Sequence, residues 1–513
     1  MAAARHLVLT LDVGTSSVRA MLHDGALEPV GEVQIQYRPR IAGDGTAEMD
    51  ADQLVEHCRT AIGRVLHRLR RSDRVAAVGF SSFWHGLLGL DAGDRPSTPL
   101  LLWSDTRSWR QARALGEQLD GEAVRRRTGA PIHPSFWPAK LSWLRGERRE
   151  DWDRTRRWVS FADYLYLQRF GEIGTSASMA SGTGLRRLDG GGWDEELLDR
   201  LGVDAGMLPP AAEEMRGCRG PEGWPRLAEA DWLTARGDGA LANLGSDCTD
   251  PSRRALTVGT SGALRAVTTT LPSLAPGLWC YLVDPGRYLV GGSFSNGGNL
   301  HEWLLQNLRV DAGQLERGLR KLPPASAEVT FLPLLYGERS PHFAPRAFGA
   351  LAPITGATSA IDIARSASEA AAMLLAVTNR ALDASAPGEG RLMASGGALV
   401  HSPAWCQVMA DAIGRPLSIL PVSEASSRGA ALEAWRRAGA EAPPPLRVKR
   451  TFRPRMEAHR AYGEAYLRLE TLYGALIRDR LFEGARGPAP EPGADGDETH
   501  PTAVSPDPGQ SGR

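Results

Sequence analysis

The sequence predicts an α/β protein made of two similar halves, each built around a mixed β-sheet. Residues 11–16 read LDVGTS and residues 256–261 read LTVGTS, so one short turn occurs twice in the chain. Each copy lies between two apolar, β-prone runs, the pattern of a strand, a tight turn and a second strand. Helical and strand patterns alternate in both halves, as they do in α/β proteins. We place the boundary near residues 246–254, which predicts domains of residues 1–250 and 251–484.

The elements of the first half follow from their apolar spacing. Residues 32–38 alternate apolar and polar side chains and predict a strand. Residues 51–71 carry apolar side chains at helical spacing and predict an amphipathic helix. Residues 74–84 are largely apolar and predict a buried strand that emerges into a loop.

The second half repeats this alternation. Residues 360–382 predict a long helix, and residues 391–399, RLMASGGAL, predict a strand that runs into a glycine turn. Residues 485–513 are rich in Pro and Gly, acidic and free of aromatic side chains, which predicts a disordered tail.

Composition excludes several classes of protein. A chain of 513 residues is too long for one core, and 60 basic against 60 acidic side chains do not indicate a nucleic-acid or membrane-surface partner. Five cysteines without a CxxC pair argue against a disulfide framework or a zinc site. The N-terminal apolar run is shorter than the roughly 7–15 residues of a secretory signal. These features predict a cytoplasmic protein.

The repeated turn is a candidate phosphate site. Backbone N–H groups and hydroxyls gather in a tight Gly-Thr-Ser turn, and glycine lets an anion approach the backbone. The residues concerned are Gly14, Thr15 and Ser16 in the first copy and Gly259, Thr260 and Ser261 in the second. Either copy alone is better explained as a plain hairpin turn, and the repetition, with Asp12 before the first copy, favours the phosphate site.

Two further features accompany the repeated turn. Asp12 precedes the first copy, and a carboxylate beside a triphosphate needs an intervening cation, so Asp12 is a candidate Mg²⁺ ligand. Gly396 and Gly397 close a predicted strand before a helix, a position that suits the nucleotide. Neither a GxxxxGK[ST] loop nor a GxGxxG fingerprint accompanies them.

Taken together, these motifs resemble the FGGY carbohydrate kinases over roughly residues 5–480. The resemblance is carried by LDVGTSSVRAMLHD, LTVGTSGALRA and the segment of residues 394–435 that begins ASGGALVHS. It is also carried by LLWSDTRS (101–108), ASMASGTGL (177–185) and FLPLLYGERSPHFAPRAFGAL (331–351). The resemblance implies two ribonuclease-H-like domains of the actin, hexokinase and Hsp70 type, with ATP and a sugar in the cleft between them.

The resemblance also assigns the catalytic carboxylate. Family members carry it in a GDG or GDN turn near the end of the first domain, which here is Asp238 in ARGDGALANLG. Asp238 would be the general base, and Thr15 and Thr260 would hold the transferring phosphoryl group with the backbone of Gly14 and Gly259. The sequence Arg-Gly-Asp at residues 236–238 also spells a cell-adhesion signal, which a cytoplasmic location disfavours.

The sugar contacts implied by the resemblance are His85, Asp105 and Arg107. Asp105 and Arg107 could instead form a local ion pair. Trp84 and Trp103 are expected in the wall of the sugar pocket or in the core, and His133 is expected to be structural.

The sugar itself is less closely defined. GDGALANLG and residues 281–305 are similar to gluconokinases, whereas GERSPHFAP is similar to xylulokinases. Many members carry Asp where this chain has Ser176. Gluconate is the preferred substrate, with Arg107 or Arg265 as the cation for its carboxylate. Xylulose, another pentulose or a polyol is the alternative acceptor, and a catalytically silent binding protein is the alternative function. The expected ligands are ATP, Mg²⁺ and the sugar, and a homodimer is left open.

Overall fold

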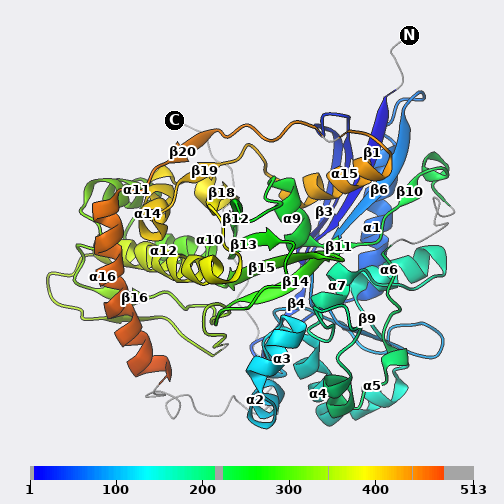
Figure 1. Cartoon of the computed structure of the whole chain (residues 1–513), viewed down its shortest axis with the longest axis horizontal. Coiled ribbons are helices and arrows are strands. Elements are labelled where there is room, and N and C mark those ends of the chain that lie inside the picture. Colours follow the sequence, from blue (N-terminus) through cyan, green and yellow to red (C-terminus); the bar gives the residue numbers. More distant parts are fainter. Residues whose placement is uncertain (1–4, 214–222, 345, 442, 479–513) are drawn as a thin grey trace, which may run out of the picture.

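Two mixed β-sheets form the centre of the protein. The computed structural model describes residues 5–213, 223–344, 346–441 and 443–478 (Figure 1). The predicted disordered tail, residues 485–513, lies outside this range. Within the described ranges, no helix is long and apolar enough to cross a membrane.

The first sheet has the strand order β10-β6-β1-β2-β3, and β11 also pairs with β6. Its strands are β1 (His6–Val13), β2 (Ser17–His23), β3 (Pro29–Gln36), β6 (Arg74–Ser82), β10 (Asp231–Trp232) and β11 (Arg236–Gly237). The predicted strand, turn and strand around Gly14 is confirmed: β1 and β2 are antiparallel, and Gly14 N–H donates to Ser17 O at 2.9 Å.

The second sheet has the order β14-β15-β13-β12-β18-β19-β20. Its strands are β12 (Arg253–Val258), β13 (Gly262–Thr268), β14 (Trp279–Asp284), β15 (Arg287–Phe294), β18 (Arg391–Ser395), β19 (Leu417–Ile419) and β20 (Arg450–Phe452). Here β12 and β13 form the antiparallel hairpin around Gly259.

The two sheets share one topology at their centres. In each, the hairpin's second strand pairs with a third antiparallel strand, β3 or β15, and its first strand pairs with a parallel strand, β6 or β18. The repeated sequence turn therefore occupies the same position in both sheets. The predicted α/β architecture of two similar halves is confirmed.

Helices cover both sheets, and the two helices that the sequence predicted are present. α1 (Ala51–Leu66) begins after Asp50, which accepts from Gln53 N–H at 2.9 Å. It ends five residues before the predicted helix, because the chain turns back into β6 and Asp73 accepts from Arg70 N–H at 2.9 Å. α12 (Ala360–Ser385) begins with a capping box between Ser359 and Asp362.

The remaining elements of the first half are α2 (Trp109–Gln118), α3 (Gly121–Thr128), α4 (Trp137–Glu147), α5 (Arg149–Arg154), α6 (Phe161–Phe170), α7 (Ala177–Ser181), α8 (Glu195–Leu201) and α9 (Asp238–Gly245), with short strands β4 (Arg40–Ile41), β5 (Ala47–Met49), β7 (Leu88–Leu90), β8 (Leu100–Leu101) and β9 (Arg157–Val159). Those of the second half are α10 (Gly298–Asn307), α11 (Ala312–Lys321), α13 (Gly397–Val400), α14 (Pro403–Ile413), α15 (Ala425–Arg437) and α16 (Met456–Tyr473), with β16 (Thr330–Leu332) and β17 (Ala350–Ala352).

One helix of the second half packs on the first sheet. α15, in orange, lies beside β1 and β6, in blue, and against α9 (Figure 1). The approach is close because glycines line it: a Cβ on Gly79 would lie 2.3 Å from Ala430 O, and one on Gly429 would lie 1.9 Å from Leu241 O. The halves are therefore joined by packed secondary structure as well as by the chain between them.

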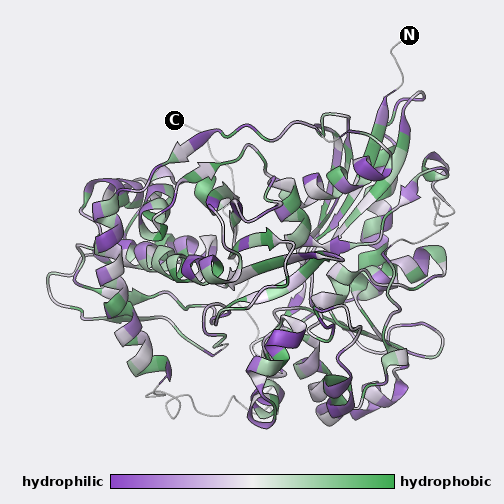
Figure 2. Cartoon of the chain, in the orientation of Figure 1, coloured by the Kyte–Doolittle hydropathy of each residue, from purple (hydrophilic) through white to green (hydrophobic). Residues whose placement is uncertain are grey.

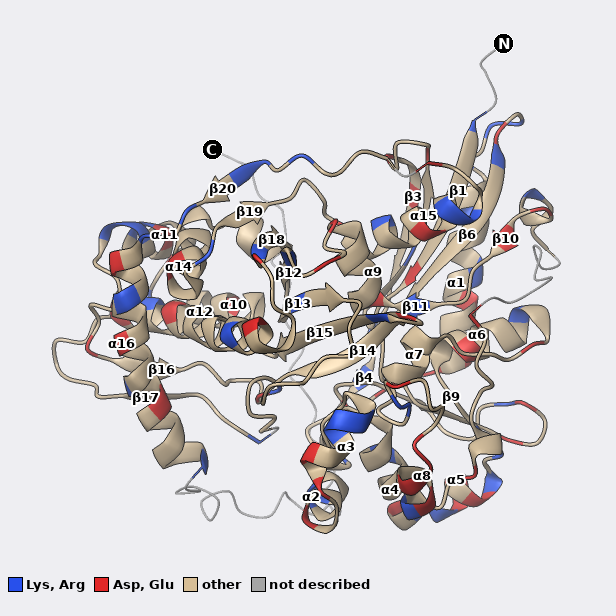
Figure 3. Ribbon diagram, viewed as in Figure 1, with Lys and Arg blue, Asp and Glu red and all other residues tan. Residues whose placement is uncertain are grey.

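The apolar side chains follow the sheets and the polar ones follow the outer helices. The strands are mainly hydrophobic in Figure 2, and one core includes Trp279 and Tyr281 of β14 together with side chains of the first half. Figure 3 shows acidic and basic side chains interspersed on the outer helices, in line with the balanced composition.

Candidate active site

Asp238 stands where a strand meets a helix. β11 pairs Gly237 with Ser82 of β6 and ends where α9 begins at Asp238. Gly237 N–H donates to Ser178 Oγ at 3.1 Å, and Gly239 N–H donates to Asp238 Oδ1 at 2.7 Å. The turn expected around Asp238 is thus the first turn of α9, which fixes the direction of the carboxylate.

The glycines on either side of Asp238 make room for the ring of Trp84. A Cβ on Gly237 would lie 1.8 Å from Trp84 Cε2, and a Cβ on Gly239 would lie 2.7 Å from Trp84 Cζ3. Gly237 has φ −63°, an ordinary backbone angle, so space and not backbone freedom requires glycine there. Trp84 is held by a 2.9 Å hydrogen bond from Nε1 to Ser178 O.

Asp238 faces a cavity of about 270 Å³ that both halves line. The first half contributes Thr15, Phe83, Trp84, His85, Trp103 and Asp238. The second half contributes Ser261, Arg265, Trp279, Tyr281, Ser293 and Arg339, among others. The cavity therefore brings together Asp238, one residue of each repeated turn, and a set of aromatic and polar side chains that suits a small polar ligand.

The acidic and basic side chains near this cavity shift the pKa of Asp238 in opposite directions. Burial and, to a lesser extent, the charge of Asp12 raise the pKa of Asp238 to about 6, and the charges of Arg265 and Arg339 act in the opposite direction. Arg265 donates to Thr257 Oγ1 at 3.0 Å, and Arg339 lies over the Trp103 ring at 4.7 Å. Among the described residues neither guanidinium has an ion-pair partner within 4.0 Å, and the Nε atom of each lacks a hydrogen-bond partner. The cavity can therefore accept an anion.

His85 presents one ring nitrogen to the cavity. Its backbone is left-handed, with φ +69°, and its carbonyl accepts a 2.8 Å hydrogen bond from the buried ammonium group of Lys140. Nδ1 lies at hydrogen-bond distance from Gly182 O, which can only accept, so Nδ1 carries the proton and Nε2 is an acceptor. Burial lowers the pKa of His85 to about 3, which keeps the ring neutral. His85 is thus a fixed acceptor for a hydroxyl.

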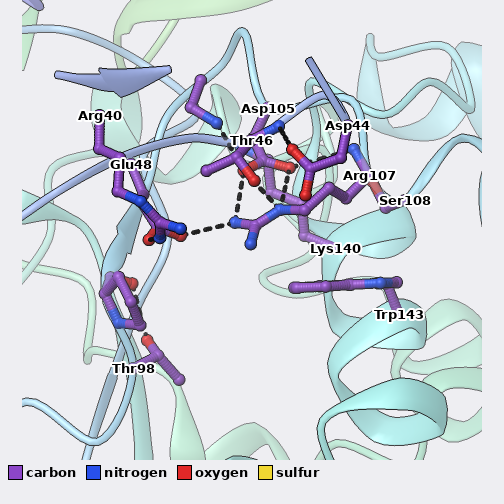
Figure 4. Close-up of polar contacts among 12 residues, drawn as sticks. Arg40, Asp44, Thr46, Glu48, Thr98, Asp105, Arg107, Ser108, Lys140 and Trp143 are labelled. Atoms are coloured by element: carbon purple, nitrogen blue, oxygen red, sulfur yellow. Dashed lines mark hydrogen bonds and ion pairs between the residues drawn. The ribbon is translucent and has the colours of Figure 1, made fainter. Parts of the chain in front are cut away.

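Asp105 and Arg107 form an ion pair away from this cavity (Figure 4). Arg107 Nη2 lies 2.6 Å from Asp105 Oδ2 and 2.8 Å from Glu48 Oε2, and its guanidinium lies 4.7 Å from the centre of the Trp143 ring. Asp105 is 1% exposed and also accepts from Ala47 N–H. The geometry corresponds to the alternative of a local ion pair, and neither side chain lines the cavity around Asp238.

Ser176 takes a structural position where many family members carry Asp. Its hydroxyl donates to Ala235 O at 2.6 Å and accepts from Met179 N–H at 3.1 Å, which caps α7. Because Ala235 lies just before Asp238 in the chain, this hydroxyl ties α7 to the segment that carries Asp238. A serine is a good helix N-cap, so the missing carboxylate leaves no unsatisfied cap.

The first turn and Asp12 are held by neighbouring segments. Asp12 Oδ2 accepts from Ser426 Oγ at 2.6 Å and from Ser427 Oγ at 3.3 Å, both in α15. Tyr37 N–H donates to Ser16 O at 3.0 Å, and the side chain of Thr15 faces the cavity. The described residues contain no cluster of three metal-ligating side chains, so a cation at Asp12 would take its other ligands from phosphate and water.

The second and third glycine turns touch each other. Gly396 has φ +102°, and a Cβ there would lie 2.3 Å from Val258 O, the residue before Gly259. The N–H groups of Gly298 and Asn299, at the start of α10, donate to the carbonyls of Gly259 and Thr260 at 2.7 and 3.1 Å. A Cβ on Gly397 would meet nothing within 4 Å, so this backbone is open to a ligand. The two predicted nucleotide turns of the second half thus form one surface.

Several cavity residues had no signal in the sequence. Arg339 lies in the family-like segment GERSPH, and Trp279, Tyr281 and Ser293 lie on strands whose apolar pattern indicates only a buried sheet. Their convergence depends on the pairing of β14, β15 and β13 and on the loop that follows β16. Arg265, one of the two cations expected for an acid sugar, lines the cavity.

Comparisons with known proteins agree with this arrangement. Residues 7–218 match the N-terminal domain, and residues 255–438 the C-terminal domain, of the FGGY family of carbohydrate kinases. The gluconokinase of Bacillus subtilis (strain 168) is 28% identical over 449 residues, covering 83% of this chain and 86% of that protein. The xylulose kinase of Streptomyces coelicolor is 33% identical over 449 residues, covering 84% and 88%.

A solved structure has the same fold. The gluconate kinase from Lactobacillus acidophilus superposes with a TM-score of 0.85 at 25% identity, covering 92% of this chain and 98% of that one. The folding pattern is that of the actin and hexokinase type. With both domain models matched in order, and with Asp238 and one residue of each repeated turn lining one cavity, the chain belongs to the FGGY family of carbohydrate kinases.

Proposed function

We propose that this carbohydrate kinase phosphorylates gluconate with ATP and forms 6-phosphogluconate. The observation that carries the proposal is the pair of arginines without ion-pair partners, Arg265 and Arg339, beside Asp238 in one cavity. A neutral sugar does not require two such cations, whereas a sugar acid brings a carboxylate that pairs well with guanidinium. Arg107, the other cation considered, is occupied by Asp105 and Glu48.

Asp238 is the general base of the proposed reaction. Its carboxylate takes the proton of the attacking hydroxyl while the new oxygen–phosphorus bond forms and the bond from the γ-phosphorus to the bridging oxygen of ATP breaks. ADP leaves with that oxygen. Phosphoryl transfer needs positioning and charge neutralisation more than covalent help from the protein, so one carboxylate suffices. His85 Nε2 accepts from another substrate hydroxyl and thereby orients the acceptor.

The glycine turns and Asp12 support nucleotide and metal binding. In this proposal Thr15 and Thr260, with the backbone of Gly14 and Gly259, hold the transferring group, and Gly396 and Gly397 line the nucleotide. Ser16 and Ser261 complete the two turns. Asp12 holds Mg²⁺, which supplies charge neutralisation when it is bound. The repulsion between Asp12 and Asp238 supports this site, because a cation between two carboxylates would relieve it.

The proposal also assigns the two domains. Residues 1–250 carry the sugar site, the first turn and the base, residues 251–484 carry the nucleotide site, and the second half also contributes Arg265 and Arg339 to the cavity. A pentulose is the second candidate acceptor, supported by the 33% identity to a xylulose kinase. A silent binding protein is disfavoured, because Asp12, Thr15, Asp238 and Thr260 are all kept.

The test is ADP release with gluconate, xylulose, ribulose, glycerol and erythritol as acceptors. We expect turnover to be highest with gluconate and to fall by at least about a thousandfold in Asp238→Ala, since removal of a general base costs this order. Asp199→Ala, an exposed carboxylate on α8, is the matched control and should retain wild-type turnover. Preference for a neutral sugar would reject gluconate as the substrate, and wild-type turnover in Asp238→Ala would reject the base.

A further inference from the structure

The cavity contains two arginines that have no ion-pair partner among the described residues, and they come from different elements of the second half. Arg265 is on β13, which begins directly after the second glycine turn. Arg339 is on the loop after β16, beside Trp103. A reaction between ATP and a sugar acid brings two anionic groups to the site, the phosphoryl group in transfer and the carboxylate of the acceptor. The surroundings of each arginine indicate which anion it faces.

Arg265 is tied to the nucleotide turns. Its Nη2 donates to Thr257 Oγ1 at 3.0 Å, and that hydroxyl lies 3.4 Å from Ser395 Oγ. Thr257 stands two residues before Gly259, and Ser395 stands directly before Gly396, so one short chain of polar contacts joins the guanidinium to both turns. Arg265 is 8% exposed, and its Nε has no partner among the described residues.

Arg265 also lies against the segment that carries the base. A Cβ on Gly239 would lie 2.8 Å from Arg265 Nη1, so the guanidinium covers the peptide next to Asp238. The guanidinium therefore contacts both the segment that carries Asp238 and a residue beside the second glycine turn. A phosphoryl group transferred from a nucleotide on these turns to a hydroxyl at Asp238 would pass close to it.

Arg339 is surrounded by a different set of cavity residues. Its guanidinium lies over Trp103, and its charge helps to lower the pKa of His85 and of His133. The adjacent Glu338 accepts from Tyr473 Oη and pairs with His342 Nδ1, each at 2.8 Å. Ser340 and Ser293 exchange two hydrogen bonds of 2.9 and 3.1 Å. These contacts hold the loop on both sides of Arg339, which lines the cavity together with Trp103 and His85.

We propose that Arg265 is a catalytic residue that binds the phosphoryl group in transfer, and that Arg339 binds the acceptor carboxylate and determines specificity for sugar acids. If the hydroxyl at one end of gluconate meets Asp238, its carboxylate lies at the other end of the molecule, away from Arg265. In transfer, the oxygen–phosphorus bond to the acceptor forms as the bond to ADP breaks, and negative charge on the phosphoryl oxygens faces Arg265. The Arg339 assignment rests on the proposed function, and the Arg265 assignment holds for any acceptor.

The test compares gluconate with glucitol, the neutral polyol in which a hydroxymethyl group replaces the carboxylate. Arg265→Met should lower kcat about a hundredfold to a thousandfold with both acceptors and change the KM for gluconate less than about threefold, as expected for a donor used in the transition state. Arg265→Lys should recover part of kcat. Arg339→Met should raise the KM for gluconate about tenfold to a hundredfold and leave the KM for glucitol unchanged.

A second readout avoids turnover. ADP, Mg²⁺, aluminium fluoride and saturating gluconate should raise the melting temperature of the wild type and of Arg339→Met, and should raise that of Arg265→Met far less. Arg254→Lys is the matched control. Arg254 is a fully buried arginine on β12 that bonds to Asn379 and Asp383 of α12. Because it lies outside the cavity, the Arg254→Lys variant should keep the wild-type kcat and KM.

The outcomes separate the two assignments from the proposed function. An Arg265→Met variant that loses affinity for gluconate but keeps kcat would overturn the phosphoryl role. An Arg339→Met variant that loses kcat equally with gluconate and glucitol would overturn the carboxylate role. If the wild type prefers a pentulose, the proposed substrate and the Arg339 role both fail, and the Arg265 role is decided with that pentulose. Absence of turnover with every acceptor would overturn both roles.

Discussion

Asp12 Oδ2 accepts a 2.6 Å hydrogen bond from Ser426 Oγ, so the end of the first strand and a helix of the second half meet at one carboxylate. Ser427 adds a second, longer bond at 3.3 Å. Both donors lie in α15, which packs on β1 and β6 and not on the sheet of its own half. The proposed metal ligand is therefore oriented by the junction between the halves.

The first prediction concerns this carboxylate. Asp12→Asn should weaken the apparent affinity for Mg²⁺ about tenfold or more, because a neutral amide is a much poorer ligand for this hard cation. Ser426→Ala should weaken it less, since it removes only an orienting hydrogen bond. Initial rates measured against Mg²⁺ concentration at saturating ATP and acceptor would test both variants. An unchanged Mg²⁺ dependence in Asp12→Asn would reject the metal site.

The second prediction follows from the raised pKa of Asp238, about 6. A general base works only when it is ionised, so kcat/KM should be level above this pH and should fall about tenfold per pH unit below it. Acceptor, ATP and Mg²⁺ are all kept well below saturation, so that the rate reports the free enzyme, in which this pKa applies. A rate that stays level down to pH 5 would contradict either the raised pKa or the role of Asp238 as base.

The same pKa predicts how stability depends on pH. A carboxyl whose pKa is higher in the folded state than in the unfolded state favours folding below its unfolded pKa, about 3.9, and that contribution is lost as the pH rises through about 6. Asp238→Asn should therefore melt above the wild type at pH 8, by about a few degrees, with a smaller difference at pH 5. Melting curves of both proteins at the two pH values give this comparison. If the melting temperatures of the two proteins differ by the same amount at pH 8 and at pH 5, Asp238 does not ionise with a raised pKa in the folded protein.

The sequence predicts those parts of the site whose residues are close together in the chain. It does not predict the parts that depend on contacts between residues far apart in the chain. The two Gly-Thr-Ser turns and Asp238 stand in short segments whose pattern is visible in the chain. The loop that brings Arg339 to the cavity is held in part by Tyr473, more than a hundred residues later, which donates to the neighbouring Glu338. Apolar spacing within the segment does not predict such a contact.

The fold, too, is predictable where it depends on local sequence and not where it depends on long-range contacts. The repeated turn predicted two similar sheets, and local apolar spacing predicted α1 and α12. The position of α15 on the sheet of the other half depends on Gly79, Gly245 and Gly429, which allow close backbone contact. Each of these glycines, taken by itself, is an ordinary residue of a strand or a helix. The sequence therefore does not indicate that α15 packs on the sheet of the first half.

The next prediction tests whether glycine is needed beside Asp238 for space. Gly237→Ala should lower kcat/KM by about a hundredfold or more and reduce thermal stability, because the new Cβ would lie 1.8 Å from Trp84 Cε2 and displace a ring that lines the cavity. Gly63→Ala is the matched control: a Cβ there meets nothing within 4 Å in helix α1, and the change should stabilise the protein by about 1 kcal/mol. Wild-type kinetics in Gly237→Ala would show that the Trp84 ring can move without consequence.

The last prediction separates a structural role from a sugar-binding role for Arg107. In the structure its guanidinium pairs with Asp105, which is 1% exposed, and with Glu48. Arg107→Met should therefore destabilise the protein by about 3–5 kcal/mol, because it leaves a buried carboxylate without its partner. Asp105→Asn together with Arg107→Met should be less destabilising than the sum of the two single changes.

Denaturant unfolding of the four proteins gives this cycle, and acceptor kinetics well below the melting temperature complete it. If Arg107 only holds the fold, the KM for the acceptor stays within about threefold of the wild type, in contrast to the larger rise expected for Arg339→Met. A large rise in KM with little loss of stability would instead return Arg107 to the sugar site. That result would also mean that the halves close further than this structure shows, because Arg107 does not line the cavity here.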